Sequence, residues 1–254
     1  MKRIFKYFLI VLFWLGLWWA AAAIVNLPLI LPSPVDVLIK LGQMSVTSLF
    51  WRVMLFSAVR VLIGILISYA AAFVLALICH RVRFLYDFFL PVISVIKTTP
   101  VTSFILIAFV LMHRDLIPGL IAALIVFPVV FSNTTEGLRS ARPELLETAK
   151  AFGLGVFDRI KCIWAPTLRP FMISAAGASA GLAIKAGIAA EVLICPEVSV
   201  GKYIFNAKQN MEYVELFAWT VAIVIFSYLL EIAFKLVLKR VKRKTKQEAV
   251  AYEN

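Results

Sequence analysis

Charged residues are scarce in this chain of 254 residues, where Asp, Glu, Lys and Arg together make up only 16% and just 14 residues are acidic. Soluble domains carry about 25% charged residues. Hydrophobic residues make up 63% of the chain, and its mean hydropathy is +0.96. This composition excludes an ordinary soluble domain and predicts a protein whose solvent is the lipid bilayer.

Residues that bind metals or nucleotides are also rare. The three cysteines, Cys79, Cys162 and Cys195, form no Cys-x-x-Cys pair, so neither a disulfide framework nor a zinc site is predicted. The two histidines, His80 and His113, stand in isolation at the edges of apolar segments, which disfavours an intramembrane enzyme. No Gly-x4-Gly-Lys-Ser/Thr segment occurs, so the chain lacks the loop that holds ATP phosphates.

Long apolar runs dominate the sequence. A membrane-spanning helix needs about 17 to 25 mostly apolar residues, and six segments reach or approach this length. The third contains Pro91, Lys97 and Pro100, and the fourth is short and contains Pro118 and Pro128, so kinked or partly re-entrant backbone is expected there. The six predicted spans are residues 5–25, 53–79, 86–112, 117–131, 171–194 and 214–237.

Basic residues are distributed unevenly between the two sides that these spans define. With the N-terminus in the cytoplasm, the inner segments hold eighteen of the 26 Lys and Arg residues and the outer segments hold five. The positive-inside rule therefore predicts that both termini are cytoplasmic. Because this asymmetry accounts for the net charge of +12, no nucleic-acid partner is predicted.

Two connections are long enough to hold structure of their own. On the outer side, Ser33 and Pro34 form a good N-cap and first turn, with Asp36 beside the positive end of the helix dipole, so a short surface helix is predicted. On the inner side, residues 132–170 are the most polar stretch before the basic tail.

This inner loop is predicted to form a helix, a turn and a second helix. Pro143 suits the first turn, Glu144 complements the helix dipole, and Gly153 can end the helix in a left-handed conformation. The second helical stretch is expected to run from Val156 to Pro166, where the chain turns back towards the membrane.

One face of the first helix in the loop is apolar, because Leu145, Ala149 and Phe152 recur at helical spacing. A helix of about ten residues is marginal alone in water. The apolar face must therefore pack either beneath the chain's own spans or against a partner protein, and the spacing leaves both interpretations open.

The loop also carries a motif, E-x-A-x3-G-x9-I-x2-P, which resembles the EAA loop of binding-protein-dependent ABC importer permeases. Thr148 and Ala165 depart from the usual pattern, in which Ala and often Leu stand at these positions. The segments LPSPVDVLIKL, SAVRVLIGILISY and GLAIKAGIAAEVL are similar to permeases of the nitrate, sulfonate and taurine importer group. The motif positions are Glu147, Ala149, Gly153, Ile163 and Pro166.

The resemblance implies an all-α integral membrane protein with the fold of a type I ABC importer permease. Residues 1–254 would form a single transmembrane domain of about six helices, without catalytic activity of its own. Its parts would be a first span at 5–25, a core at 53–237, the EAA loop at 132–170 and a cytoplasmic tail at 238–254.

Partners are implied by the same resemblance. A cytosolic ABC ATPase dimer would bind ATP and Mg²⁺, since this chain also lacks an LSGGQ-like signature and needs no cofactor itself. An extracytoplasmic binding protein would deliver a small polar or anionic solute, similar to a sulfonate, taurine or nitrate or to a vitamin or aromatic compound. A second copy would complete a homodimer in the bacterial inner membrane. The residues implied in coupling to the ATPase are Leu145, Leu146, Glu147, Ala149, Phe152, Gly153 and Pro166.

Two charged residues lie towards the outer ends of the predicted spans. An unpaired charge near the centre of the bilayer costs about 2.5–3.5 kcal/mol. Because Arg60 and Glu191 lie away from the centre, structural anchoring is the favoured role for both.

Two lysines fall near the middle of their spans. Lys97 is followed by Thr98 and Thr99 before a proline, so the local backbone can line a cavity, and Lys185 lies in the fifth span. One hypothesis is a basic translocation path formed by these four residues, suited to a polar or anionic solute. The alternative, held equal, is a pair of interhelical ion pairs.

An ion-coupled secondary transporter is the main alternative function. Such a carrier needs no ATPase, but it typically has internal repeats and coupling carboxylates in the middle of its spans. The sequence contains neither feature.

Overall fold

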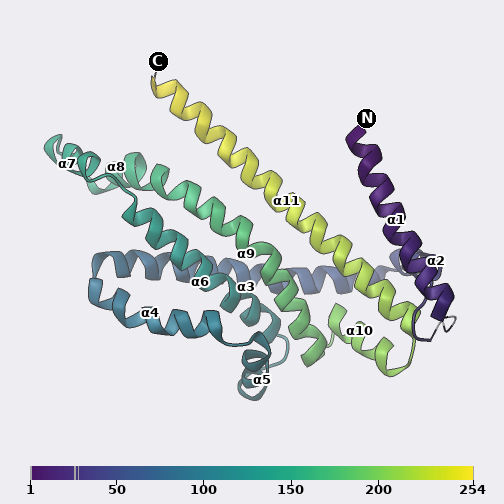
Figure 1. The fold of residues 1–254 in the computed structure, drawn as a ribbon. Helices are drawn as coiled ribbons and strands as arrows, with labels where there is room; N and C mark the ends of the chain where they lie inside the picture. The colour runs from purple at the N-terminus through teal and green to yellow at the C-terminus, as the bar shows by residue number, and fades with distance from the viewer. Residues whose placement is uncertain (1, 26, 28, 254) are drawn as a thin grey trace. The chain divides into compact units, whose positions relative to one another are not determined.

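The computed structural model is built from helices joined by short connections (Figure 1). It describes the backbone of residues 2–25, 27 and 29–253, and the side chains of these residues except 2–4, 7, 8, 234, 235 and 237–253. Within this described part there is no strand, and the predicted all-α class is confirmed. The side chains of the predicted tail at 238–254 lie outside the described residues.

The chain divides into two compact units, each made of two separate stretches of sequence. The smaller unit comprises Met1–Ala58 and Glu191–Phe226, and the larger unit comprises Val59–Ala190 and Ser227–Asn254. Both units contain part of each of three long helices, which are α3 (Ser48–Arg81), α9 (Ala165–Ile194) and α11 (Tyr213–Glu253).

The smaller unit also contains α1 (Lys2–Val25), α2 (Pro34–Ser45) and α10 (Val200–Gln209). The start of α2 agrees with the sequence prediction. The Ser33 hydroxyl accepts a hydrogen bond from the Asp36 N–H at 3.2 Å and donates one to the Asp36 carboxylate at 2.7 Å. This reciprocal pair satisfies a backbone donor that the first turn would otherwise leave free.

Aromatic side chains form the core of the smaller unit. The Trp219 ring of α11 stacks on Phe50 of α3, with centroids 5.3 Å apart, and contacts Tyr203 of α10 at 5.2 Å. Ser199 caps α10 by accepting a hydrogen bond from the Lys202 N–H at 3.1 Å. The cap and the aromatic contacts together fix α10 against the beginning of α11.

Among the described residues, four helices are long and apolar enough to cross a bilayer, judged by length and composition. They are Ser48–Arg81, Ile117–Arg139, Val156–Ile194 and Tyr213–Ala233, and they correspond to the second, fourth, fifth and sixth predicted spans. The first predicted span corresponds to α1, whose described apolar part, Leu9–Val25, is shorter than these four. A multi-spanning helical membrane protein is thereby confirmed.

The third predicted span is a bent pair of helices rather than one rod. α4 (Arg83–Thr98) and α5 (Val101–Leu111) are bent by 103° at a short break, as in a broken span or a re-entrant loop. Thr99 in the break has an extended ψ of 133°, because the proline that follows disfavours helical backbone at the residue before it. The kink expected within residues 86–112 is therefore confirmed, and it is located at Pro100.

α6 (Ile117–Arg139) continues beyond residue 131, where the fourth span was predicted to end and the inner loop to begin. The helix therefore extends into the first part of the predicted loop, because the polar side chains that follow bond back to carbonyls of the same helix. Asn133 Nδ2 donates to Val129 O at 2.8 Å, and Thr134 Oγ1 donates to Val130 O at 2.7 Å. Back-bonding of this kind satisfies polar groups without ending the helix.

The helix after the inner loop also runs further than predicted. α8 (Val156–Arg159), η1 (Ile160–Trp164) and α9 form one continuous helix of 39 residues. η1 is a π-helical turn in which the Ala165 N–H bonds to Ile160 O. The expected turn of the chain at Pro166 was wrong, because this wider turn directly before the proline lets the helix continue through it.

Glycines allow the helices of the larger unit to approach closely. A Cβ atom on Gly64 of α3 would overlap the carbonyl oxygen of Gly119 of α6, and one on Gly187 of α9 would meet the Val61 side chain at 2.5 Å. Close approach at small residues is the usual way in which transmembrane helices pack. α4 and α5 pack on α6 as well, so α6 contacts several other helices of this unit.

Candidate functional site

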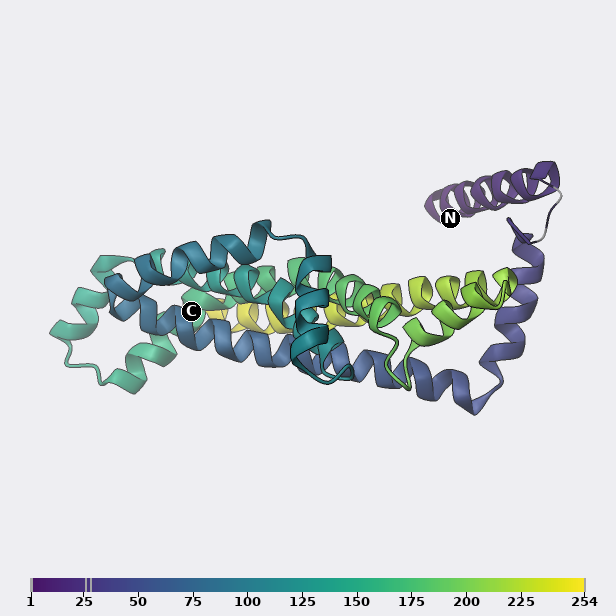
Figure 2. The same ribbon diagram turned by 90° about the horizontal axis from the view of Figure 1, so that it is seen from below.

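The inner loop folds into the predicted helix, turn and helix at the end of the larger unit where α3 passes into α4 (Figure 2). α7 (Pro143–Ala151) begins with its proline in the first turn and Glu144 near the positive end of the helix dipole. It ends at Ala151 and is followed by Gly153, which has a φ of 65°, and the Leu154 N–H bonds to Ala149 O at 2.9 Å. The predicted left-handed glycine is confirmed, since only glycine adopts this backbone without strain.

A cluster of apolar side chains is exposed around the turn between α7 and α8, and we call it the docking surface. Phe152 and Phe157 are each 79% exposed and Val156 is 73% exposed, while Leu145 and Ile160 are about half exposed, at 48% and 50%. Contiguous apolar side chains at a surface are typical of a site that binds another protein or a membrane. The docking surface therefore favours a partner over packing beneath the chain's own spans.

The remaining residues implied in coupling differ in their exposure. Glu147 and Pro166 are exposed, and Leu146 is half-buried. Ala149 of α7 and Ile163 of η1 are both buried, at 3% and 7% exposed. The predicted apolar face therefore divides into a buried part at Ala149 and an outward part, which remains available.

Sequence reasoning missed three members of the docking surface, Val156, Phe157 and Ile160. A signal for them was present, because they are apolar residues at positions i, i+1 and i+4 of a helix that starts directly after a Gly-Leu-Gly turn. A short helix with such a face at a turn of the chain cannot bury it locally.

Lys97 lies at the C-terminal end of α4, beside the break. Its side chain is exposed, and Nζ donates a hydrogen bond to Ser132 Oγ of α6 at 3.0 Å. The hydroxyls of Thr98 and Thr99 bond to carbonyls of their own helix, Ser94 O at 3.0 Å and Val95 O at 2.7 Å. The ammonium group thus sits at the negative end of the α4 dipole, where a positive charge interacts favourably with the last carbonyls.

Lys185 lies in the C-terminal half of α9 with its side chain exposed. Within the part of the chain that the structure describes, it has neither a hydrogen-bond partner nor an ion-pair partner. Its exposed neighbours along the helix recur every three or four residues and are mostly small: Ser174, Ala178, Leu182 and Ala189. The interhelical ion pairs considered for the two lysines are absent from the described residues, and the structure records no contact between Lys97 and Lys185.

Arg60 and Glu191, the two charged residues for which anchoring was favoured, have defined partners. Arg60 Nη2 forms an ion pair with Asp115 Oδ1 at 2.8 Å. Glu191 is fully buried, and its carboxylate accepts hydrogen bonds from Ser57 Oγ at 2.7 Å and from the Gly201 N–H at 3.4 Å. These contacts agree with anchoring roles for Arg60 and Glu191, since buried charges are retained where they are paired and hydrogen-bonded.

Known proteins resemble this chain over most of its length. Residues 64–247 match the protein family described as binding-protein-dependent transport system inner membrane component. The glycine betaine/carnitine transport permease protein GbuB of Listeria monocytogenes serotype 1/2a (strain 10403S) is 24% identical over 183 residues, which cover 72% of this chain and 64% of that protein. The chain thus matches less than two thirds of the length of this relative. Both descriptions are of transport components, and neither supports the nitrate, sulfonate and taurine group in particular.

Proposed function

The chain belongs to the family of binding-protein-dependent transport system inner membrane components, and we propose that it is the membrane-spanning permease subunit of an ABC importer. The observation that carries this proposal is the docking surface, with Phe152 and Phe157 each 79% exposed on a loop that bears the EAA-like motif. In the proposal, a cytosolic ATPase dimer covers this surface and binds ATP and Mg²⁺, while the chain itself makes and breaks no bond.

Continuity of the helix after the docking surface supports a mechanical role. The helix Val156–Ile194 begins at the docking surface and carries Lys185 in its apolar part. A displacement of α8 by a closing ATPase dimer would be transmitted along this helix, since a hydrogen-bonded helix is stiff on the scale of a domain. In this way, closing and reopening of the ATPase dimer makes the path open first to one side of the membrane and then to the other.

The basic residues support the orientation of the subunit. With eighteen of the 26 Lys and Arg residues in the inner segments, both termini and the docking surface lie in the cytoplasm. In our proposal the chain crosses the bacterial inner membrane with about six helical segments, of which α4 and α5 form one. A second copy completes a homodimer around the translocation path.

We assign the exposed ammonium groups of Lys97 and Lys185 to this path. Thr98 and Thr99, which lie at the break between α4 and α5, are assigned to its lining. A basic path suits a small anionic or polar solute similar to a sulfonate, taurine or nitrate or to a vitamin or aromatic compound, handed over by an extracytoplasmic binding protein. The name of the Listeria relative adds glycine betaine and carnitine to the candidate solutes. The carboxylate groups of these two compounds would contact the same lysines.

Lys185→Met is expected to lower the kcat/KM for uptake of an anionic solute by about tenfold or more, because an anion in a water-poor path would lose its counter-charge. The measurement is uptake into vesicles that contain the assembled complex, with ATPase activity recorded in parallel. Lys208→Met, at an exposed position near the end of α10, is the control and should leave kcat/KM unchanged. Wild-type kinetics in the Lys185 variant would remove this residue from the path.

The assembly itself is tested by co-purification from native membranes in mild detergent. We expect the tagged chain to retain an ABC ATPase in a ratio of one ATPase copy per permease copy, and to retain a second permease copy. A chain that transports solute with no ATPase bound, driven by an ion gradient instead, would contradict the proposal in favour of a secondary transporter.

A further inference from the structure

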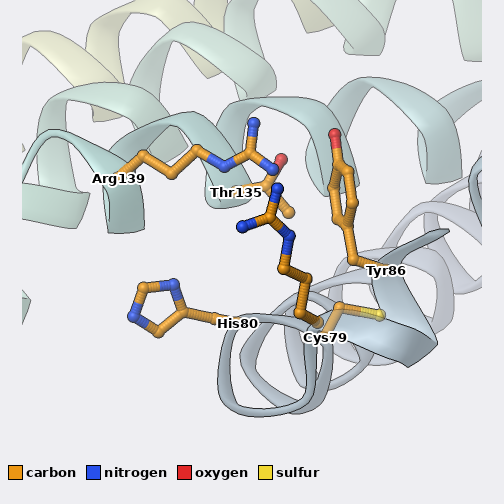
Figure 3. Close-up of a pocket in the computed structure, with 6 residues that line it drawn as sticks. Cys79, His80, Tyr86, Thr135 and Arg139 are labelled. Atoms are coloured by element: carbon orange, nitrogen blue, oxygen red, sulfur yellow. The ribbon is translucent and has the colours of Figure 1, made fainter.

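A cavity of about 390 Å³ opens at the end of the larger unit where α3, α4 and α6 meet (Figure 3). Its size lies within the range of about 300–1,000 Å³ that is typical of small-molecule sites. None of its lining residues belongs to the docking surface, the path residues or the Glu191 network, so the proposed transport function gives it no role. The side chains that line it are Cys79, His80, Arg83, Tyr86, Thr135 and Arg139.

The lining is rich in positive charge. Arg83 and Arg139 both face the cavity, and neither has a carboxylate partner among the described residues. The acidic groups nearest in sequence, Asp87 and Glu136, are exposed and are not part of the lining. Two guanidinium groups that share a cavity repel each other unless an anion lies between them, so the cavity is complementary to a negatively charged ligand.

The geometry suits a phosphate group in particular. The Arg139 guanidinium lies over the Tyr86 ring, 4.5 Å from its centroid, which holds the arginine in place before any ligand arrives. Figure 3 shows this guanidinium beside Thr135, with the His80 ring on another side of the cavity. The planar guanidinium group of arginine can donate hydrogen bonds to two phosphate oxygens at once. Imidazole and phenol hydroxyl groups can donate to the remaining phosphate oxygens.

The surroundings of the cavity are typical of a membrane interface. Phe84 and Phe88 in the first turns of α4 are 73% and 59% exposed, and their rings stack on each other. Tyrosine and tryptophan gather at the level of the lipid headgroups, and Tyr86 lines the cavity. Basic pockets between transmembrane helices on the cytoplasmic side bind anionic headgroups.

We propose that this cavity binds a phosphate-bearing anion, with the headgroup of an anionic phospholipid as the source that its surroundings favour. The His80 ring contacts Trp164 of η1 edge-on, with centroids 5.4 Å apart. The bound phosphate therefore braces the end of α3 near the π-helical turn through which the docking surface joins α9. Binding does not depend on transport, so its failure is distinguishable from failure of the proposed function.

The test compares variants of the full-length chain in nanodiscs of phosphatidylcholine containing a minority of phosphatidylglycerol. Native mass spectrometry counts the phosphatidylglycerol molecules that remain bound after release. Arg83→Gln combined with Arg139→Gln is expected to reduce this retention about tenfold or more, because charge-assisted bonds to phosphate are lost. Arg83→Lys combined with Arg139→Lys keeps the charge and should lose roughly two- to fivefold, because lysine lacks the bidentate fork.

A matched control removes two positive charges that lie outside the cavity. Arg81→Gln combined with Lys161→Gln, both at exposed positions, should retain phosphatidylglycerol as the unmodified chain does. This control separates binding in the cavity from the general attraction of a basic surface for anionic lipid.

A second arm distinguishes lipid from soluble phosphate. In nanodiscs of phosphatidylcholine alone, inorganic phosphate or pyrophosphate is titrated while the thermal stability of the chain is followed. If phosphate or pyrophosphate stabilises the unmodified chain but not the Arg83/Arg139 double variant, the cavity binds a soluble phosphate compound. If neither compound stabilises the unmodified chain and phosphatidylglycerol is retained, the cavity binds lipid. Equal behaviour of the unmodified chain and the double variant in both arms overturns the proposal.

Discussion

Phe157→Asp is expected to abolish ATP-driven uptake while leaving the chain inserted in the membrane. Phe157 is 79% exposed on the docking surface and belongs to neither hydrophobic cluster of the described residues, so its replacement is expected to leave the fold intact. Loss of a central aromatic contact in an interface typically costs about 2–4 kcal/mol, which is roughly a 30- to 1,000-fold loss of affinity for the ATPase. Pull-down of the ATPase and uptake by reconstituted vesicles measure the effect.

Conservative variants separate docking from damage to the loop. Phe157→Leu keeps an apolar side chain and should retain most of the ATPase, and Asp158→Asn, at an exposed neighbouring position, should behave as the unmodified chain. Gly153→Ala introduces a side chain where φ is 65° but where no atom lies within 4 Å, so only backbone strain of about 1 kcal/mol is expected. Normal uptake by Phe157→Asp with the ATPase still bound would place the coupling contact elsewhere.

Glu191→Ala is expected to destabilise the chain more than any substitution at a single exposed position. The fully buried carboxylate accepts hydrogen bonds from Ser57 Oγ and from the Gly201 N–H, and Ser57 Oγ in turn accepts one from the Val200 N–H at 3.1 Å. Truncation leaves buried donors unpaired and opens a cavity, at a cost of about 3 kcal/mol. We expect the midpoint of thermal denaturation in detergent to fall by roughly 6–12 °C.

The same network supplies its own controls. Glu191→Gln retains an oxygen that can accept from Ser57, and its midpoint should fall much less. Gly201→Ala should approach the effect of Glu191→Ala, because a Cβ there would overlap the backbone between Glu191 and Val192. Gly42→Ala in α2, where no atom lies within 4 Å, should be neutral or slightly stabilising. An unchanged midpoint for Glu191→Ala would show that the network does not hold α10 in place.

The sequence by itself determined the class of this protein and several local features. Low charge and long apolar runs predict a membrane protein, because transfer of apolar residues into lipid depends on composition and length alone. The cap at Ser33, the left-handed Gly153 and the kink at Pro100 were predictable as well, since each depends on a few neighbouring residues. The docking loop was located, although only part of its exposed surface was recognised.

Only the tertiary structure decided which charged and apolar side chains meet. The ion pair of Arg60 with Asp115 joins residues from different elements, as does the bond from Ser57 to Glu191, whose sequence separation is 134. The burial of Ala149, the exposure of Phe157 and the basic cavity between three helices likewise depend on distant segments. Hydropathy and capping are local properties, whereas burial and pairing depend on how helices far apart in sequence pack together, and this is why the sequence could not supply them.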